Sequence, residues 1–196
     1  MEELTRCPVQ LRCPWCEGDA IYTAYHDKEW GKPLKNNQKL FELLTLEGAQ
    51  AGLSWITILK RREGYREAFE GFDAEKIARY TAKDLNRLMA DTRIIRNRRK
   101  IQSTIENARL YLEMMEGRQS FSKWLWNFVD GEPIVNHWHS MKEVPVTTAL
   151  AEQISKELKQ KGFSFVGPTI IYSYMQSAGL VNDHLVSCFR HRELTA

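Results

Sequence analysis

The acidic residue Glu47 attracts attention because the helix expected around it is otherwise apolar. A charge in such a place is costly unless it is paired or used. Small residues follow it in the segment 48–52 (GAQAG), and they would let another group approach closely. Tyr22 and Tyr25 lie on one side of another expected helix, and a carboxylate between aromatic walls suits a flat cationic ring. The alternative is that Glu47 pairs with an arginine while the tyrosines only pack, and these residues alone leave both interpretations open.

Cysteine and histidine residues form a second candidate site. His184 and Cys188 are four residues apart, and we expect them to be adjacent on one helical face, which gives half of a tetrahedral zinc site. The other candidate ligands are Cys7, Cys13, Cys16 and His26. Spacing alone favours Cys13 with Cys16, in the sequence CPWC, as the second pair of zinc ligands. A redox role for these two cysteines would need a strand-to-helix setting that the chain does not offer. Four protein ligands leave no open position, so the predicted zinc ion is structural and ties the two chain ends together.

A basic cluster is the third feature, with five cations within eight residues. It comprises Arg93, Arg96, Arg98, Arg99 and Lys100. The cluster spans a tight turn between two expected helices, and a helix that begins there offers free N–H groups and a positive dipole end. We therefore favour phosphate contact over the alternative of a plain solvated turn. The turn resembles a helix-hairpin-helix element, although Thr92 and Arg93 stand where that element usually has glycine.

Helical patterns must position these groups, and such patterns dominate the chain. We predict helices over residues 39–50, 55–62, 75–79, 85–89, 98–112, 149–161 and 169–178. Residues suited to capping stand at four of the expected N-termini, namely Ser54, Asp73, Thr81 and Thr148. Strand signals are weak, with the best at residues 133–135, inside a long expected surface loop over 131–146. The sequence thus predicts an all-α fold in a single unit spanning residues 1–196.

Length and composition are ordinary for a soluble globular protein. The chain has 196 residues, of which 43% are hydrophobic and 27% charged. No apolar run approaches the roughly 18 residues that a membrane span needs, and the acidic start does not resemble a secretory signal. We therefore expect a cytoplasmic protein without disulfides and without a membrane partner. The net charge of +3 is too small to identify a polyanionic partner, so the case for nucleic acid depends on the local cluster.

Six segments together resemble the 3-methyladenine DNA glycosylase I family of the helix-hairpin-helix glycosylase superfamily. They are residues 13–15 (CPW), 22–31 (YTAYHDKEWG), 46–55 (LEGAQAGLSW), 94–101 (IIRNRRKI), 162–167 (GFSFVG) and 179–184 (GLVNDH) with Cys188. These segments cover nearly the whole chain in order. The resemblance implies a helix-hairpin-helix element at about residues 84–108, and a zinc site that joins residues 13–30 to residues 180–190.

The resemblance also implies roles for individual residues. The expected zinc ligands are Cys13, His26, His184 and Cys188, so Cys16 is displaced from the pair that spacing favoured. Glu47 is expected to be the essential carboxylate, with recognition of the charged base as its first role and catalysis as its second. The expected base-binding residues are Tyr22, Tyr25, Trp55 and Trp15. Leu53 is expected to wedge into the gap left by the flipped nucleotide, while Cys7 and Cys16 receive no role.

The activity implied by the resemblance is hydrolysis of the N-glycosidic bond of 3-methyladenine in alkylated double-stranded DNA, by a monomer. N3-alkylation makes adenine cationic, so the base departs as a neutral molecule and needs no general acid. No lysine is placed for Schiff-base chemistry, and we expect an abasic site without strand cleavage. Two alternatives stay open: a non-catalytic, zinc-stabilised nucleic-acid-binding module, and a zinc hydrolase that uses His26, Asp27 and His184 around an open metal position.

Overall fold

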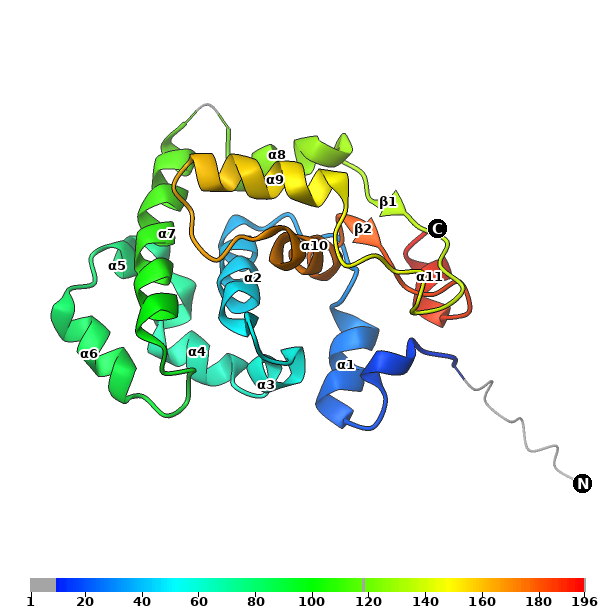
Figure 1. Cartoon of the computed structure of the whole chain (residues 1–196), viewed down its shortest axis with the longest axis horizontal. Helices are drawn as coiled ribbons and strands as arrows, with labels where there is room; N and C mark the ends of the chain where they lie inside the picture. The colour runs from blue at the N-terminus through cyan, green and yellow to red at the C-terminus, as the bar shows by residue number, and fades with distance from the viewer. Residues whose placement is uncertain (1–9, 118, 196) are drawn as a thin grey trace, which may run out of the picture.

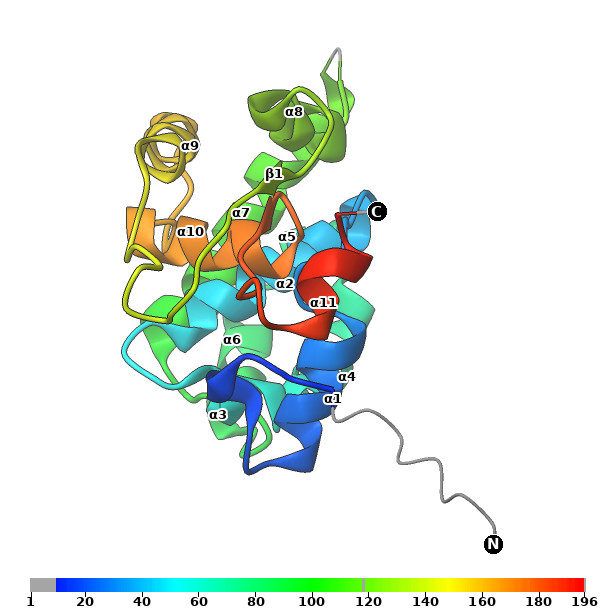
Figure 2. The same ribbon diagram turned by 90° about the vertical axis from the view of Figure 1, so that its right-hand side faces the viewer.

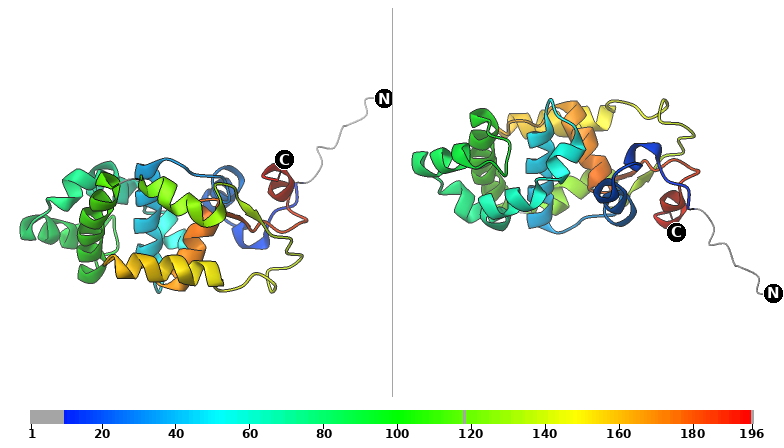
Figure 3. Two further views of the ribbon diagram at one scale, coloured as in Figure 1. Left: turned by 90° about the horizontal axis from the view of Figure 1, so that it is seen from above. Right: turned by 90° about the horizontal axis from the view of Figure 1, so that it is seen from below.

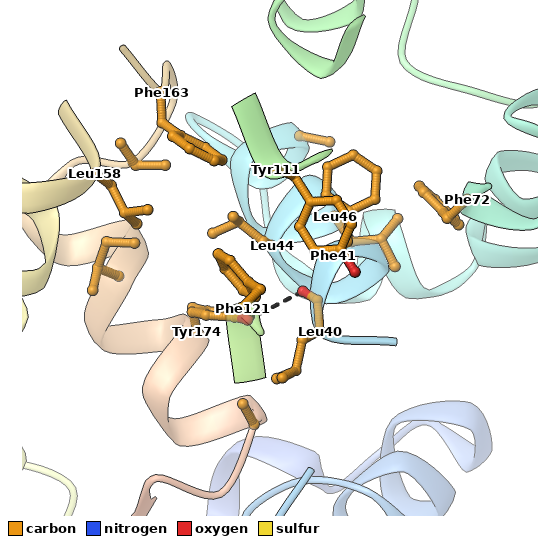
Figure 4. Packing of buried hydrophobic residues seen from close by; sticks show 14 of the residues in the cluster. Leu40, Phe41, Leu44, Leu46, Phe72, Tyr111, Phe121, Leu158, Phe163 and Tyr174 are labelled. Carbon is orange, nitrogen blue, oxygen red and sulfur yellow. Dashed lines mark hydrogen bonds between the residues drawn. The ribbon is translucent and has the colours of Figure 1, made fainter. Parts of the chain in front are cut away.

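The computed structural model describes residues 10–117 and 119–195, and helix α2 (Asn37–Gln50) lies at their centre. Most of this helix is buried, on several sides rather than along one stripe, as is typical of a helix enclosed by others. Figure 4 shows Leu40, Phe41 and Leu44 of α2 in the packed interior, with Tyr174 of α10 (Pro168–Ser177) beside them. The hydroxyl group of Tyr174 donates a hydrogen bond to the carbonyl oxygen of Leu40 at 3.1 Å, so this buried polar group is satisfied.

The other elements confirm the all-α prediction. The remaining α-helices are α1 (Ala20–Lys28), α3 (Trp55–Leu59), α4 (Arg62–Ala68), α5 (Ala74–Ala78), α6 (Ala82–Ala90), α7 (Arg98–Glu116), α8 (Phe121–Trp126), α9 (Ala149–Gln160) and α11 (Phe189–Glu193). Short 3₁₀ helices occur at Pro14–Cys16, Glu70–Phe72 and Asn127–Val129. Within the described residues, the strands are β1 (Ile134–Val135) and β2 (Val181–Asn182), which pair in parallel with Ile134 opposite Val181. The predicted short strand and the loop around it are confirmed.

Local capping explains where several helices begin. Asp73 accepts hydrogen bonds from backbone N–H groups at the start of α5, and Thr81 forms a capping box with Asp84 at the start of α6. The side chain of Thr148 accepts a hydrogen bond from the backbone N–H of Ala151 and so caps α9. Ser54 precedes α3 as expected, but its hydroxyl group pairs with the side chain of a threonine rather than capping the backbone.

One predicted helix is shorter than expected, and one expected helical segment is wrong. The predicted helix 55–62 ends at Leu59, and the chain turns before α4 begins at Arg62. Residues 184–188 form bends and turns ahead of α11 rather than a helical face. In both places the backbone follows contacts made by other parts of the chain, and local side-chain periodicity does not report such contacts.

Helices α2 and α10 lie in the middle of the molecule, with one end of the molecule on each side of them. At one end, α4, α5 and α6 gather beside α7, and α5 and α6 pack against it, as Figures 1 and 3 show. At the other end, α1, the two short strands and α11 gather, and the segment before α1 lies beside α11 (Figure 2). The N–H group of Phe189 donates a hydrogen bond to the carbonyl oxygen of Leu11 at 3.0 Å, which joins these distant parts of the sequence. No helix in the described ranges is both long and apolar enough to cross a membrane.

Candidate functional site

A cavity of about 190 Å³, which we call the base cavity, lies where α1, α2, α3 and α10 meet the loop that follows β1. Its lining includes every side chain that the sequence assigned to base binding: Trp15, Tyr22, Tyr25, Glu47 and Trp55. It is smaller than a typical site for a drug-sized ligand, which has about 300–1,000 Å³. The size and the aromatic lining suit a single flat ring.

Glu47 is buried in this cavity without a cationic partner among the described residues. Its side chain is 2% exposed, and its Oε1 accepts a hydrogen bond from the hydroxyl group of Ser177 at 2.6 Å. Burial raises the pKa of Glu47 to about 8, and the hydrogen bond from Ser177 opposes this rise. The alternative in which Glu47 pairs with an arginine is therefore wrong. A buried carboxyl group with a displaced pKa, in a cavity, is typical of a functional site.

Aromatic rings form much of the wall of the cavity. Trp15 contacts Tyr22 with ring centroids 4.9 Å apart, and Tyr25 contacts Trp55 at 5.6 Å. The hydroxyl group of Tyr25 and the indole N–H of Trp55 are buried and have no hydrogen-bond partner among the described residues. Buried polar groups are rarely left unpaired, so these two groups point to a ligand or to bound water.

A second, larger cavity of about 300 Å³ adjoins the first. The two share Tyr25, Trp55 and Ser177, but the larger one does not include Glu47. Its remaining lining is mostly basic and acidic side chains, including Arg62 in an ion pair with Glu29. Because recognition of a cationic ring needs the unpaired carboxyl group, we place the candidate site in the smaller cavity.

Sequence reasoning missed several residues of the base cavity. Those with polar side chains are Gln50, Ser173, Gln176, Ser177 and Asp183. Most of them come from α10 and the segment after β2, where the sequence shows a largely apolar run followed by the motif NDH. The signal that could have found them is the presence of polar residues within a helix as apolar as α10.

The four predicted metal ligands come together at the end of the molecule opposite the basic turn. The ligand atoms of Cys13, His26, His184 and Cys188 all lie within 4.8 Å of one another, and all four residues are buried. The nitrogens of the two histidines are 3.2 Å apart, and the sulfur of Cys188 lies 3.5 and 3.6 Å from them. In a zinc tetrahedron the corresponding edges are about 3.3 Å and about 3.5 Å. These four residues therefore fit a tetrahedral metal ion.

Neighbouring groups orient both histidines for this role. The Nδ1 atom of His26 lies 2.8 Å from a carboxylate oxygen of Asp27, which leaves Nε2 to face the cluster. The Nε2 atom of His184 lies 3.1 Å from the carbonyl oxygen of Trp30, which leaves Nδ1 as its ligand atom. Asp27 therefore acts behind the cluster rather than beside an open metal position, and the geometry does not support the zinc hydrolase alternative.

Cys16 lies beside this cluster but does not belong to it. Its thiol group donates a hydrogen bond to the carbonyl oxygen of Cys13 at 3.1 Å. The pairing of Cys13 with Cys16 that spacing alone favoured is thus wrong, because the chain turns the Cys16 side chain toward the backbone of its own turn. Cys7 lies outside the described residues.

The basic turn separates its five cations into three kinds. Arg93 is held in ion pairs with Asp91 and Glu67. Lys100 donates hydrogen bonds from Nζ to the carbonyl oxygens of Ala49 and Ala51, at 2.8 and 2.6 Å. Arg96, Arg98 and Arg99 are exposed and form no ion pair with a described residue, whereas Arg93 is exposed but paired. The expectation that all five contact phosphate therefore loses support for Arg93 and Lys100, whose charged groups already have partners.

The turn itself does not need the glycine that was expected. No residue between α6 and α7 has a positive φ, and the N–H of Arg93 donates to a carboxylate oxygen of Asp91 at 2.9 Å. The close approach comes instead from Gly64 of α4, where a Cβ atom would lie 2.6 Å from the Cβ of Arg93. Ile94 is buried in the core, as predicted, and Ile95 is partly buried and packs against the core.

Leu53 lies at the tip of the turn between α2 and α3. Its side chain is 40% exposed. Gly52 before it has φ of +77°, a conformation that glycine adopts without strain. Lys100 holds the carbonyl oxygen of Ala51 in this same turn. The structure thus presents an apolar side chain on a short, anchored turn.

Comparison with known proteins gives a consistent picture. The family model described as methyladenine glycosylase matches residues 15–191. The chain is 51% identical over 180 residues to a DNA-3-methyladenine glycosylase of Haemophilus influenzae, covering 92% of this chain and 97% of the relative. A crystal structure of a 3-methyladenine DNA glycosylase I is similar with a TM-score of 0.90 and 50% identity, over 91% of this chain and 98% of that chain. A Staphylococcus aureus structure that addresses 3-methyladenine recognition has a TM-score of 0.88 and 42% identity, over 91% and 95% of the two chains.

Proposed function

The chain belongs to the methyladenine glycosylase family, and from this premise we propose that it hydrolyses the N-glycosidic bond of 3-methyladenine in alkylated DNA. The product would be the free base and an abasic site. Relatives of about half-identical sequence carry this activity in their names, and a structural relative was solved to explain 3-methyladenine recognition. The proposed role is therefore base excision repair of alkylation damage.

One observation carries the proposal: the buried Glu47 carboxyl group, unpaired with any described cation, lines a small cavity walled by aromatic rings. A cationic purine would stack between the rings and place its charge beside this carboxylate. Neutral adenine would gain nothing comparable from the charge. Tyr25 and Trp55 would supply the hydrogen-bond donors that are now without partners.

The chemistry follows from the charge of the substrate. The raised pKa of about 8 means that Glu47 holds a proton in the free site at neutral pH. Entry of a cation would favour the ionised carboxylate and expel this proton. Cleavage of the glycosidic bond then releases a neutral base, so the protein need not protonate the leaving group, and water attacks the sugar. No lysine lines the cavity in the described part of the chain, which supports release of the base without strand cleavage.

Contacts with the duplex would come from two anchored turns. We propose that α6, α7 and the turn between them form the helix-hairpin-helix element, in which Arg96, Arg98 and Arg99 bind phosphate. Leu53 would fill the gap left by the extruded nucleotide. Arg93 and Lys100 would hold these two turns in place rather than meet phosphate, because their charged groups are already bound.

The metal site has a structural role in this proposal. Zinc would be held by Cys13, His26, His184 and Cys188, and four protein ligands would leave no position for substrate. When bound, the ion supplies a cross-link between the two ends of the chain. We also propose that the chain acts as one unit over residues 1–196, as a monomer and in the cytoplasm.

The decisive test is incubation of the protein with methylated duplex DNA, followed by chromatographic identification of the liberated bases. We expect 3-methyladenine to appear in stoichiometric amounts with abasic sites, and the strands to stay intact until alkali is added. Tight DNA binding without any released base would instead identify a non-catalytic binding module and would end the proposal.

A further inference from the structure

Two carboxyl groups line the base cavity, and their surroundings differ. Glu47 and Asp183 are both 2% exposed. Glu47 accepts a hydrogen bond from one side chain, Ser177, whereas Asp183 accepts from four side chains. These four donors are Asn136 and Trp138 to Oδ1, at 2.7 and 2.8 Å, and Tyr172 and Gln176 to Oδ2, at 2.5 and 2.8 Å. A carboxylate has about four acceptor positions. Asp183 is therefore fully engaged with the protein, and its effect on a substrate must pass through the groups that it holds.

Gln176 is the one of these four donors that lines the base cavity. Its amide nitrogen Nε2 donates to Asp183, and a carboxylate saturated with donors can only accept there. This network fixes the orientation of the amide: its nitrogen faces Asp183, and its oxygen Oε1 faces away. Among the described residues no group donates to Oε1, and this oxygen is not sealed off from solvent. Gln176 thus combines a place in the wall of the cavity with a hydrogen-bond acceptor that has no described partner.

An oriented acceptor can discriminate where charge cannot. 3-Methyladenine and 3-methylguanine are both cationic in DNA, so the carboxylate of Glu47 attracts both. At the six position adenine has an amino group that donates and guanine has an oxygen that accepts, while guanine carries its amino group at position two. An acceptor in the wall favours the amino group and leaves two facing acceptors unpaired when guanine enters.

We propose that Oε1 of Gln176 accepts a hydrogen bond from the amino group at position six of the extruded adenine, and that Asp183 is the positioning residue that holds the amide in this orientation. The proposal deepens the proposed glycosylase function and rests on it. Gln176 becomes a specificity-determining residue, while Glu47 provides selection for charge. The loop after β1 contributes through Asn136 and Trp138, which keep Asp183 in place.

The test measures selectivity rather than activity alone. DNA methylated so that it contains both 3-methyladenine and 3-methylguanine is treated with excess enzyme, and the single-turnover rates of release of the two bases are compared. In Gln176→Met, a side chain of similar length without polar atoms, we expect 3-methyladenine release to fall about 10- to 100-fold. Release of 3-methylguanine should fall much less, so the ratio of the two rates decreases. An unchanged ratio would overturn the assignment of Gln176.

Two further variants test the positioning role. In Asp183→Asn the new amide can donate, so the Gln176 amide is free to turn its nitrogen toward the cavity, and the ratio should fall as in Gln176→Met. Adding Gln176→Met to Asp183→Asn should then change the ratio no further. Tyr172→Phe is the matched control, because it removes another donor to the same oxygen but does not line the cavity, and it should keep the wild-type ratio. A normal ratio in a folded Asp183→Asn variant would show that Asp183 does not position Gln176.

A spectroscopic measurement covers the case in which Asp183→Asn fails to fold. In the wild-type protein, one of the two side-chain N–H protons of Gln176 should be shifted strongly downfield by its bond to the carboxylate and should exchange slowly with solvent. Shifts and exchange rates like those of a free glutamine amide would contradict the fixed orientation. If the wild-type protein releases neither base, the proposed function itself fails, and this outcome is distinct from any result on the ratio.

Discussion

The hydroxyl group of Ser177 donates a hydrogen bond to Oε1 of Glu47 at 2.6 Å. Among the described side chains, no other group donates to this buried carboxyl group. Burial raises the pKa of Glu47 to about 8, and this one bond limits the rise. The balance between the two effects sets how much of the site carries a negative charge at neutral pH. Several measurable properties depend on it.

The first is the pH dependence of the wild-type reaction. A cationic base should bind best to ionised Glu47, so kcat/KM should increase as the pH rises from 6 to about 8 and then level off, because kcat/KM reports the free enzyme. The single-turnover rate at saturating enzyme should vary much less, because the bound cation already holds Glu47 ionised. Rate measurements on methylated duplex DNA between pH 5.5 and 9.5 check this. A kcat/KM that falls over this range would contradict the account.

Replacing Ser177 should move this profile. Ser177→Ala removes the bond that favours the ionised carboxylate, so the midpoint of the kcat/KM profile should shift to higher pH by about one unit. Activity should drop several-fold at pH 7 and return toward the wild-type value near pH 9.5. Ser173→Ala provides the control, since Ser173 lines the same cavity without a hydrogen bond to Glu47. Equal profiles for the two variants would exclude this role of Ser177.

Glu47→Gln should separate activity from stability. We expect release of 3-methyladenine to fall at least about 100-fold, because the cation would be buried without its counter-charge. Glu116→Gln, on an exposed part of α7, should release the base at the wild-type rate.

The same substitution should have a pH-dependent effect on the free energy of unfolding. The folded pKa of Glu47 lies above the unfolded value, so the stability linked to its proton is fully present below about pH 4.5 and is lost as the pH rises to about 8. The difference in stability between Glu47→Gln and the wild type should therefore shift in favour of the variant by about 3 kcal/mol between pH 5 and pH 8. Urea unfolding at both pH values measures it, and a constant difference would refute the raised pKa.

Metal removal should unfold the end of the molecule that holds α1 and α11. Cys188→Ala should abolish stoichiometric zinc binding and lower the Tm by about 10 °C or more. Cys16→Ala should keep one zinc ion per chain and lower the Tm by only a few degrees, because its buried thiol is not a ligand. Metal analysis and calorimetry of the two variants decide the matter. Retention of zinc by Cys188→Ala would refute the ligand set.

Lys100 and Arg99 adjoin in sequence but should differ in their effect on salt dependence. Arg99→Met should lower the slope of log K against log salt concentration for duplex binding by about one unit, as the loss of a phosphate contact does. Lys100→Met should leave that slope unchanged but reduce base release about 10-fold, because the turn that carries Leu53 loses its anchor. A lower slope in Lys100→Met would mean that this lysine meets phosphate after all.

The amino-acid sequence alone determined the features that depend on near neighbours. Capping residues such as Thr81 and Asp84 and the apolar periodicity of α7 predicted where most helices lie, because these signals act within one or two turns of the chain. Resemblance to a known family predicted the four clustered ligands and the aromatic residues around Glu47. Spacing without that resemblance favoured the wrong cysteine, since Cys13 and Cys16 are close in sequence while the true partners of Cys13 come from both ends of the chain.

Only the tertiary structure decided which charged groups are free to act. The sequence does not distinguish Arg93 from Arg96, yet Arg93 forms an ion pair with Glu67 because the fold brings α4 beside the turn. In the sequence, Gln176 is simply a polar residue in a largely apolar helix. In the fold, its amide group donates a hydrogen bond to Asp183, and this bond orients it. Hydrogen bonds and ion pairs form between whichever groups packing brings together, and burial sets their strength. The chemical character of a side chain is therefore written in the sequence, but its partners and its protonation are properties of the folded chain.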